Sequence, residues 1–171
     1  MSILETGIEI PLFNPENYAK QGLIKQLMMN EKSVGAVGKV TYGQCDDDLG
    51  VFTLDTDNTN NTPDPVTKGS NVSLNLAGIV DDTMNISNVH IHVDWNSAPL
   101  YDEDHKQNNT YTSAYKYSLT WAVPSYAPSG AYAVKLTGTG ASSSGQGTAL
   151  CITANFSLWV SNQIETYKHT S

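Results

Sequence analysis

The chain has 171 residues, of which 17 are acidic and 9 are basic, and all nine basic residues are lysine. A formal net charge of -8, with no guanidinium group to bind phosphate bidentately, argues against nucleic acid or a strongly anionic membrane surface as a partner. Charged residues make up 15% of the chain against a usual value of about 25%, and threonine, serine and asparagine take their place. We therefore expect one β-rich domain that is large enough to bury its own core.

The first 37 residues differ in pattern from the rest and form an N-terminal arm. Residues 8–10 are strand-like, and apolar residues then recur at roughly helical spacing from Glu16 to about Lys32. Asn14 is the expected cap and Pro15 the first helical residue. The sequence therefore predicts a short amphipathic helix, which either lies on its own domain or docks on a partner.

From residue 38 the apolar period changes from 3.6 to 2, which is typical of half-buried strands. About seven such strands, separated by turn residues, predict an all-β, immunoglobulin-like sandwich over residues 38–161, followed by a tail at 162–171. Residues 96–109 are expected to form a long connection, either mobile or shaping a mouth, and 138–147 a Gly/Ser-rich loop. The inward-facing positions of the strands are Val72, Leu74, Leu76, Val89, Ile91, Val93, Trp95, Leu119, Trp121, Tyr132, Val134, Phe156 and Leu158.

Candidate catalytic and metal-binding patterns are weak. His90, His92 and Asp94 share one face of a strand, but it is the solvent face, and a further metal ligand would have to come from a neighbouring strand. We therefore expect an exposed polar row there and no metal site. The sequence contains no calcium-binding loop, nucleophile elbow or phosphate-binding glycine loop. We expect neither a cofactor nor an enzymatic activity.

The two cysteines and five sequons bear on the compartment. Cys45 and Cys151 permit one bridge, which would require an oxidising compartment, or they are two buried free thiols. The beginning of the sequence as given carries no signal peptide, and no stretch of about 18 apolar residues predicts a transmembrane segment. Glycosylation along a secretory route requires accessible sequons, and the candidate asparagines are Asn60, Asn71, Asn85, Asn108 and Asn155.

One segment carries a family resemblance. The run VPSYAPSGAYAV at residues 123–134 resembles the proline-bearing turn and Pro-x-Gly-x-Tyr-x-Val strand of the ML domain. This is the MD-2-related lipid-recognition family, which includes Niemann–Pick C2-type sterol carriers and phosphatidylglycerol/phosphatidylinositol transfer proteins. Three further features fall in the expected order over residues 38–160: Cys45 before Phe52-Thr53-Leu54, Pro63-Asp64-Pro65 and Gly69 before an alternating strand, and Leu150-Cys151 before Phe156.

The resemblance implies two splayed sheets that hold a lipid, and it implies a disulfide between Cys45 and Cys151. The other cysteines usual in the family are absent, and the arm before Cys45 is additional. The leading hypothesis is a secreted, extracellular or lysosome-like lumenal glycoprotein that binds and transports a sterol or phospholipid, with the thirteen inward positions lining its cavity. The alternative is a structural subunit whose residues 1–37 dock on a neighbouring copy, forming a homo-oligomer or larger assembly.

Overall fold

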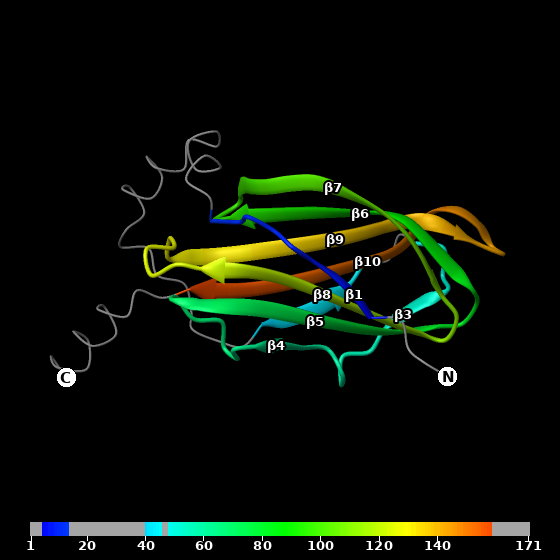
Figure 1. Cartoon of the computed structure of the whole chain (residues 1–171), viewed down its shortest axis with the longest axis horizontal. Coiled ribbons are helices and arrows are strands. Elements are labelled where there is room, and N and C mark those ends of the chain that lie inside the picture. Colours follow the sequence, from blue (N-terminus) through cyan, green and yellow to red (C-terminus); the bar gives the residue numbers. More distant parts are fainter. Residues whose placement is uncertain (1–4, 14–39, 46–47, 159–171) are drawn as a thin grey trace, which may run out of the picture.

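The computed structural model describes residues 5–13, 40–45 and 48–158, and every regular element within them is a strand. Ten strands form two five-stranded sheets that pack as a sandwich, so the expected all-β architecture is confirmed with more strands than the predicted seven (Figure 1). The predicted helix at residues 16–32 and the tail at 162–171 lie outside the described residues. Among the described residues no helix is long and apolar enough to cross a bilayer.

The two sheets differ in their pairing. The first sheet has the order β1 (Glu5–Glu9), β8 (Ala114–Val123), β5 (Ser70–Val80) and β3 (Phe52–Leu54), with β4 (Asn60–Thr62) also paired to β5. The second sheet has the order β2 (Thr41–Gln44), β10 (Gly145–Leu158), β9 (Gly130–Ser142), β6 (Met84–Trp95) and β7 (Ala98–Tyr111). Every pairing is antiparallel except that of β1, which runs parallel to β8.

The core lies between the sheets because apolar residues alternate with polar ones along each long strand. All thirteen inward positions named above are buried, and none is more than 5% exposed. The N-terminal segment contributes to the same core, since Ile10, Leu12 and Phe13 are also buried. The first strand and the residues after it are therefore packed as part of the sandwich.

Two predicted loops are strands. Residues 96–109 fall largely in β7, which follows β6 through a two-residue turn. The turn residues Asn96 and Ser97 both have positive φ, as in the turn types that connect the strands of tight hairpins. Residues 138–147 fall in β9 and β10, which meet in a tight turn at Ser143 and Ser144. The prediction failed for β7 because both of its faces are mostly polar, so its hydrophobicity does not alternate.

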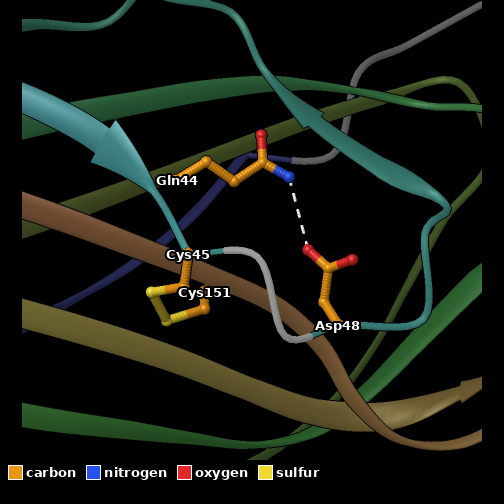
Figure 2. The surroundings of a disulfide bond; sticks show 4 residues. All are labelled: Gln44, Cys45, Asp48 and Cys151. Atoms are coloured by element: carbon orange, nitrogen blue, oxygen red, sulfur yellow. Dashed lines mark hydrogen bonds between the residues drawn. A yellow bond between two sulfur atoms is a disulfide. The ribbon is translucent and has the colours of Figure 1, made fainter.

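One edge of the sandwich, where β2 meets β3, is held by Gln44; we call it the clasped edge. The Gln44 amide Nε2 donates to the carbonyl oxygen of Phe52 at 2.8 Å, and its Oε1 accepts from the backbone N–H of Leu54 at 2.8 Å. The amide thus pairs with β3 as a peptide group would. Nε2 also lies 3.3 Å from a carboxylate oxygen of Asp48, beside the disulfide (Figure 2).

The disulfide joins neighbouring strands of the second sheet at this edge. Cys45 directly follows β2 and bonds Cys151 of β10, with an S–S distance of 1.99 Å and a Cα–Cα distance of 5.2 Å. The backbone N–H of Cys45 donates to the carbonyl of Cys151 at 3.0 Å, which continues the β2–β10 ladder. Both side chains lie on the outer faces of their strands, because the adjacent residues Gln44 and Ile152 face inward. The bridge is consistent with an oxidising compartment.

Replacing Cys45 and Cys151 together with alanine removes a link between residues 106 positions apart. The chain-entropy model assigns such a link about 4–5 kcal/mol of stability. We expect the double variant to unfold at lower urea concentration than the oxidised chain, and the reduced native chain to match the variant. Tryptophan fluorescence during urea titration, with and without reductant, measures both, and equal stability of variant and oxidised chain would contradict the expectation.

Candidate functional site

The opposite edge, where β7 of the second sheet meets β1 of the first, is built differently; we call it the open edge. Val89, Ile91 and Val93 of β6 face inward and lie opposite His105, Glu103 and Tyr101 of β7. Residues directly opposite each other in an antiparallel pair point to the same face. The inner face of β7 therefore carries a polar row, in contrast to the apolar inner faces of the other long strands.

The polar row is partly open to solvent. Glu103 faces inward by register and is nevertheless exposed, so the first sheet does not cover the middle of β7. Tyr101 is buried, its hydroxyl lies 2.9 Å from Nε2 of His105, and the two rings stack. Burial raises the pKa of Tyr101 to about 12, and the charge of Glu103 adds to this shift. Tyr101 therefore remains protonated at ordinary pH.

A tyrosine cluster, formed by Tyr111, Tyr115 and Tyr117, lies where β7 ends and β8 begins. The ring centroids of Tyr111 and Tyr115 are 4.8 Å apart, and Tyr115 stacks on Tyr117 at 6.2 Å. Phe52 of β3 meets the edge of Tyr115 at 5.4 Å. The Tyr111 hydroxyl lies 2.8 Å from Oγ1 of Thr6, a hydrogen bond that joins β7 to β1 across the open edge.

Four buried polar atoms have no hydrogen-bond partner in the described part of the chain: Nε2 of Gln107, the hydroxyls of Tyr115 and Tyr117, and Nε1 of Trp121. A buried polar group without a partner costs about 1–3 kcal/mol, so native structures rarely tolerate one without a reason. Here three belong to inward-facing residues of one strand, β8, and the fourth to β7 across the interior.

At the other end of the interior the side chains are mainly aromatic, and the polar atoms of Trp95 and Tyr132 have hydrogen-bond partners, whereas Nε1 of Trp121 has none among the described residues. Trp121 stacks on Phe156 at 5.9 Å, and Phe156 stacks on Tyr132 at 5.2 Å. The Tyr132 hydroxyl donates to the carbonyl of Pro128 at 2.6 Å, and Nε1 of Trp95 donates to the carbonyl of Ser129 at 3.2 Å. Sequence reasoning placed Trp121 and Tyr132 inward, yet it omitted Tyr115 and Tyr117, although these have the same strand parity as Trp121.

The outer face of β6 and β7 carries a chain of alternating carboxylates and imidazoles. Asp104 lies 2.8 Å from Nδ1 of His90, whose Nε2 lies 3.0 Å from Asp102; the other Asp102 oxygen lies 2.6 Å from Nδ1 of His92, whose Nε2 lies 2.8 Å from Asp94. The acidic partners that the sequence did not place beside His90 and His92 thus come from β7. No group of three or more potential ligands among the described residues is arranged to hold a metal ion.

These contacts shift the pKa values of both partners. The hydrogen bond to Asp104 raises the pKa of His90, and for His92 the hydrogen bonds to Asp102 and Asp94 outweigh the lowering effect of burial. The pKa of Asp102 is lowered mainly by His92, and that of Asp104 by Asn88 and then His90. Because each ring nitrogen faces a carboxylate, all four hydrogen bonds form only when both imidazoles are protonated.

The candidate glycosylation sites lie on outer faces. Asn60, Asn71, Asn108 and Asn155 are exposed, whereas Asn85 is half-buried and donates to Oδ1 of Asn108 at 3.1 Å. Two surface hollows lie on the same outer faces. One of about 340 Å³ is lined by residues of β2, β6, β9 and β10, and one of about 230 Å³ by residues of β1, β4, β5 and β8. Neither hollow is walled by the polar row of β7.

Comparisons with known proteins give weak structural alignments only. No family model matches the chain, and no curated protein matches it significantly. An Archaeoglobus fulgidus protein of known crystal structure aligns with a TM-score of 0.37 at 10% identity, over 71% of this chain and 97% of that one. The Pseudomonas fluorescens alkylpurine DNA glycosylase AlkC aligns with a TM-score of 0.36 at 14% identity, over 88% of this chain and 41% of that one. Both values are too low to support a functional argument.

The outer carboxylate–imidazole chain predicts a pH-dependent stability. Raised histidine pKa values mean that this stabilisation is complete below the unfolded value of about 6.5 and is lost as the pH rises through the folded values. Lowered aspartate pKa values mean that it is also lost as the pH falls below about 4. We expect His90→Gln/His92→Gln to lower the urea midpoint at pH 5.5 much more than at pH 8.5.

His105→Gln, on the inner face of the same strand pair, is the matched control and should not reproduce that pH dependence. Lys135 of β9 lies opposite His92 in the register, but it is not among the groups that shift the pKa of His92. A double variant whose loss of stability is the same at both pH values would contradict this account of the network.

Proposed function

We propose that the protein is a non-enzymatic lipid carrier that holds an apolar ligand between its two sheets. The observation that carries the proposal is the asymmetry of the two edges. Gln44 and the disulfide fix the clasped edge, whereas the open edge presents the polar row of β7 and the hydrogen bond between Thr6 and Tyr111. In such a sandwich the two sheets separate most readily at the open edge, because the clasped edge holds them together.

The interior supplies the affinity in this proposal. Each methylene transferred from water into an apolar interior contributes roughly 0.8 kcal/mol, so an acyl chain or sterol body is held with few polar contacts. The residues that would enclose it are the buried positions of β5, β6, β8, β9 and β10. The ML-domain resemblance of residues 123–134 supports the same function, and the exposed sequons together with the disulfide support secretion into an oxidising lumen.

Lipid uptake tests the proposal directly. Native mass spectrometry of the purified chain should reveal a bound lipid, and the delipidated chain should take up a fluorescent sterol or phospholipid. Ala154→Phe fills the interior from β10 and should reduce uptake at least tenfold, whereas the matched Ala122→Phe on the outer face of β8 should leave it unchanged. A chain that carries no lipid and takes up neither probe would overturn the proposal.

The alternative, an assembly subunit, gains one observation. Strand β1 is the edge strand of the first sheet and pairs in parallel with β8. In this alternative, β1 of one copy pairs with β8 of a neighbouring copy, which presents the same edge. Deletion of residues 1–37 is a poor test of this alternative, because it also removes Ile10, Leu12 and Phe13 from the core.

Gly7→Val tests the assembly function more cleanly. A Cβ at Gly7 collides with the carbonyl oxygen of Ser118, so the variant displaces β1 without removing any core residue. If β1 joins copies, light scattering should show an assembly for the native chain and a monomer for Gly7→Val. A native chain that is monomeric at micromolar concentration would exclude this function.

A further inference from the structure

The orphan donors identify the kind of lipid, an inference that rests on the proposed carrier function. We propose that Gln107, Tyr115 and Tyr117 bind the polar end of an uncharged lipid through an oxygen atom that accepts hydrogen bonds. The apolar body of the lipid then lies along β8 towards Trp121. The unpartnered buried atoms of Gln107, Tyr115 and Tyr117 are in this account the half of a hydrogen-bonded site that the protein supplies.

Three of the donors belong to one neighbourhood. Tyr115 and Tyr117 follow each other on the inner face of β8 with their rings stacked, and Tyr111 of β7 packs against Tyr115. Burial raises the pKa of Tyr111, and the polar groups of Thr6, Gln107 and Asn109 near its hydroxyl oppose that rise, although Nε2 of Gln107 itself has no hydrogen-bond partner among the described residues. Gln107 therefore lies beside the tyrosine cluster. The site thus takes residues from both sheets, near the open edge where β7 meets β1.

The chemistry of the orphan groups requires an acceptor. The amide nitrogen of Gln107 and the indole nitrogen of Trp121 donate hydrogen bonds and cannot accept them. Burial raises the pKa of Tyr115 and Tyr117 well above the ordinary tyrosine value, so both hydroxyls keep their protons. A hydroxyl, ester or ketone oxygen accepts hydrogen bonds from these donors, whereas a hydrocarbon leaves the donors without a partner.

The charges around the site favour an uncharged ligand. Lys106 and Lys116 are exposed residues that alternate with the inward-facing residues of β7 and β8, so they lie on the outer faces. Glu103 is the charged residue that the open edge presents on its inner face. A phosphate or carboxylate at the tyrosine cluster would find no inward-facing lysine on β7 or β8 to offset its charge.

The spacing suits a ligand with an apolar body. Tyr117 and Trp121 are four residues apart on β8, which corresponds to about 13 Å along the strand. Leu119 lies between them and is fully buried. An uncharged lipid whose oxygen meets Tyr117 thus places apolar surface against Leu119 and reaches the Trp121–Phe156 stack.

The competing explanation is buried water on the tyrosine hydroxyls. Paired lipids and phenylalanine variants separate the two explanations. Binding is measured with radiolabelled cholesterol, 5α-cholestane (the sterol skeleton without its hydroxyl), dioleoylglycerol and dioleoylphosphatidylglycerol. The variants are Tyr115→Phe/Tyr117→Phe and, as matched control, Tyr42→Phe of β2, whose hydroxyl already donates to Oδ1 of Asn61 at 2.8 Å and which lies outside the residues that would enclose the lipid.

We expect the native chain to bind cholesterol or dioleoylglycerol at least tenfold more tightly than cholestane and phosphatidylglycerol; which of the two uncharged lipids binds identifies the source of the oxygen. Tyr115→Phe/Tyr117→Phe should reduce the preference for cholesterol over cholestane, or the binding of dioleoylglycerol, about tenfold. It should also raise the Tm of the empty protein, because it removes unsatisfied hydroxyls. Tyr42→Phe should lower Tm and keep the preference.

Equal binding of uncharged lipids and cholestane by the native chain would overturn this inference and leave the carrier function standing. So would a preference for phosphatidylglycerol, or a preference that survives the double variant. A lower Tm for the empty double variant would assign the hydroxyls to buried water and would equally overturn it. If none of the four lipids binds, the carrier function fails and the inference fails with it.

Discussion

Gln44 holds two sheets together with a side chain that behaves like a piece of backbone. Its amide presents one donor and one acceptor, and both meet the backbone of β3 at 2.8 Å. The disulfide beside it fixes β2 to β10, so the clasp is anchored in the second sheet (Figure 2). With that edge fixed, the rest of the sandwich is free to differ, and the open edge carries polar groups that a closed core would exclude.

The interior combines two demands that oppose each other in an ordinary core. Apolar side chains fill the space between the sheets, and hydrogen-bond donors without partners lie among them. In a protein selected for stability alone, phenylalanine at positions 115 and 117 would avoid the cost of buried hydroxyls. Tyrosine at both positions is understandable if stability of the empty protein is exchanged for recognition of a ligand oxygen.

The sequence predicted the parts of the fold that have a strong apolar period. It identified the sandwich, and its thirteen inward positions are all buried. It failed at β7, where polar residues occupy both faces and only pairing to β6 defines the strand. Gln107 could therefore not be placed on the inner face from the sequence, because that placement depends on a register that hydrophobicity does not encode. Tyr115 and Tyr117 could have been found, since their parity with Leu119 and Trp121 is visible in the sequence.

The parallel pairing of β1 with β8 also constrains the order in which the chain folds. Glu5 pairs with Lys116, so the first strand has no partner until more than a hundred further residues have been made. At a synthesis rate of about 5–20 residues per second, that interval lasts roughly 5–20 s. A similar interval separates the synthesis of Cys45 from that of its disulfide partner Cys151. The sandwich therefore closes only after β8 and β10 have been made, and the nascent chain depends on its surroundings to protect an unpaired strand and a free thiol until then.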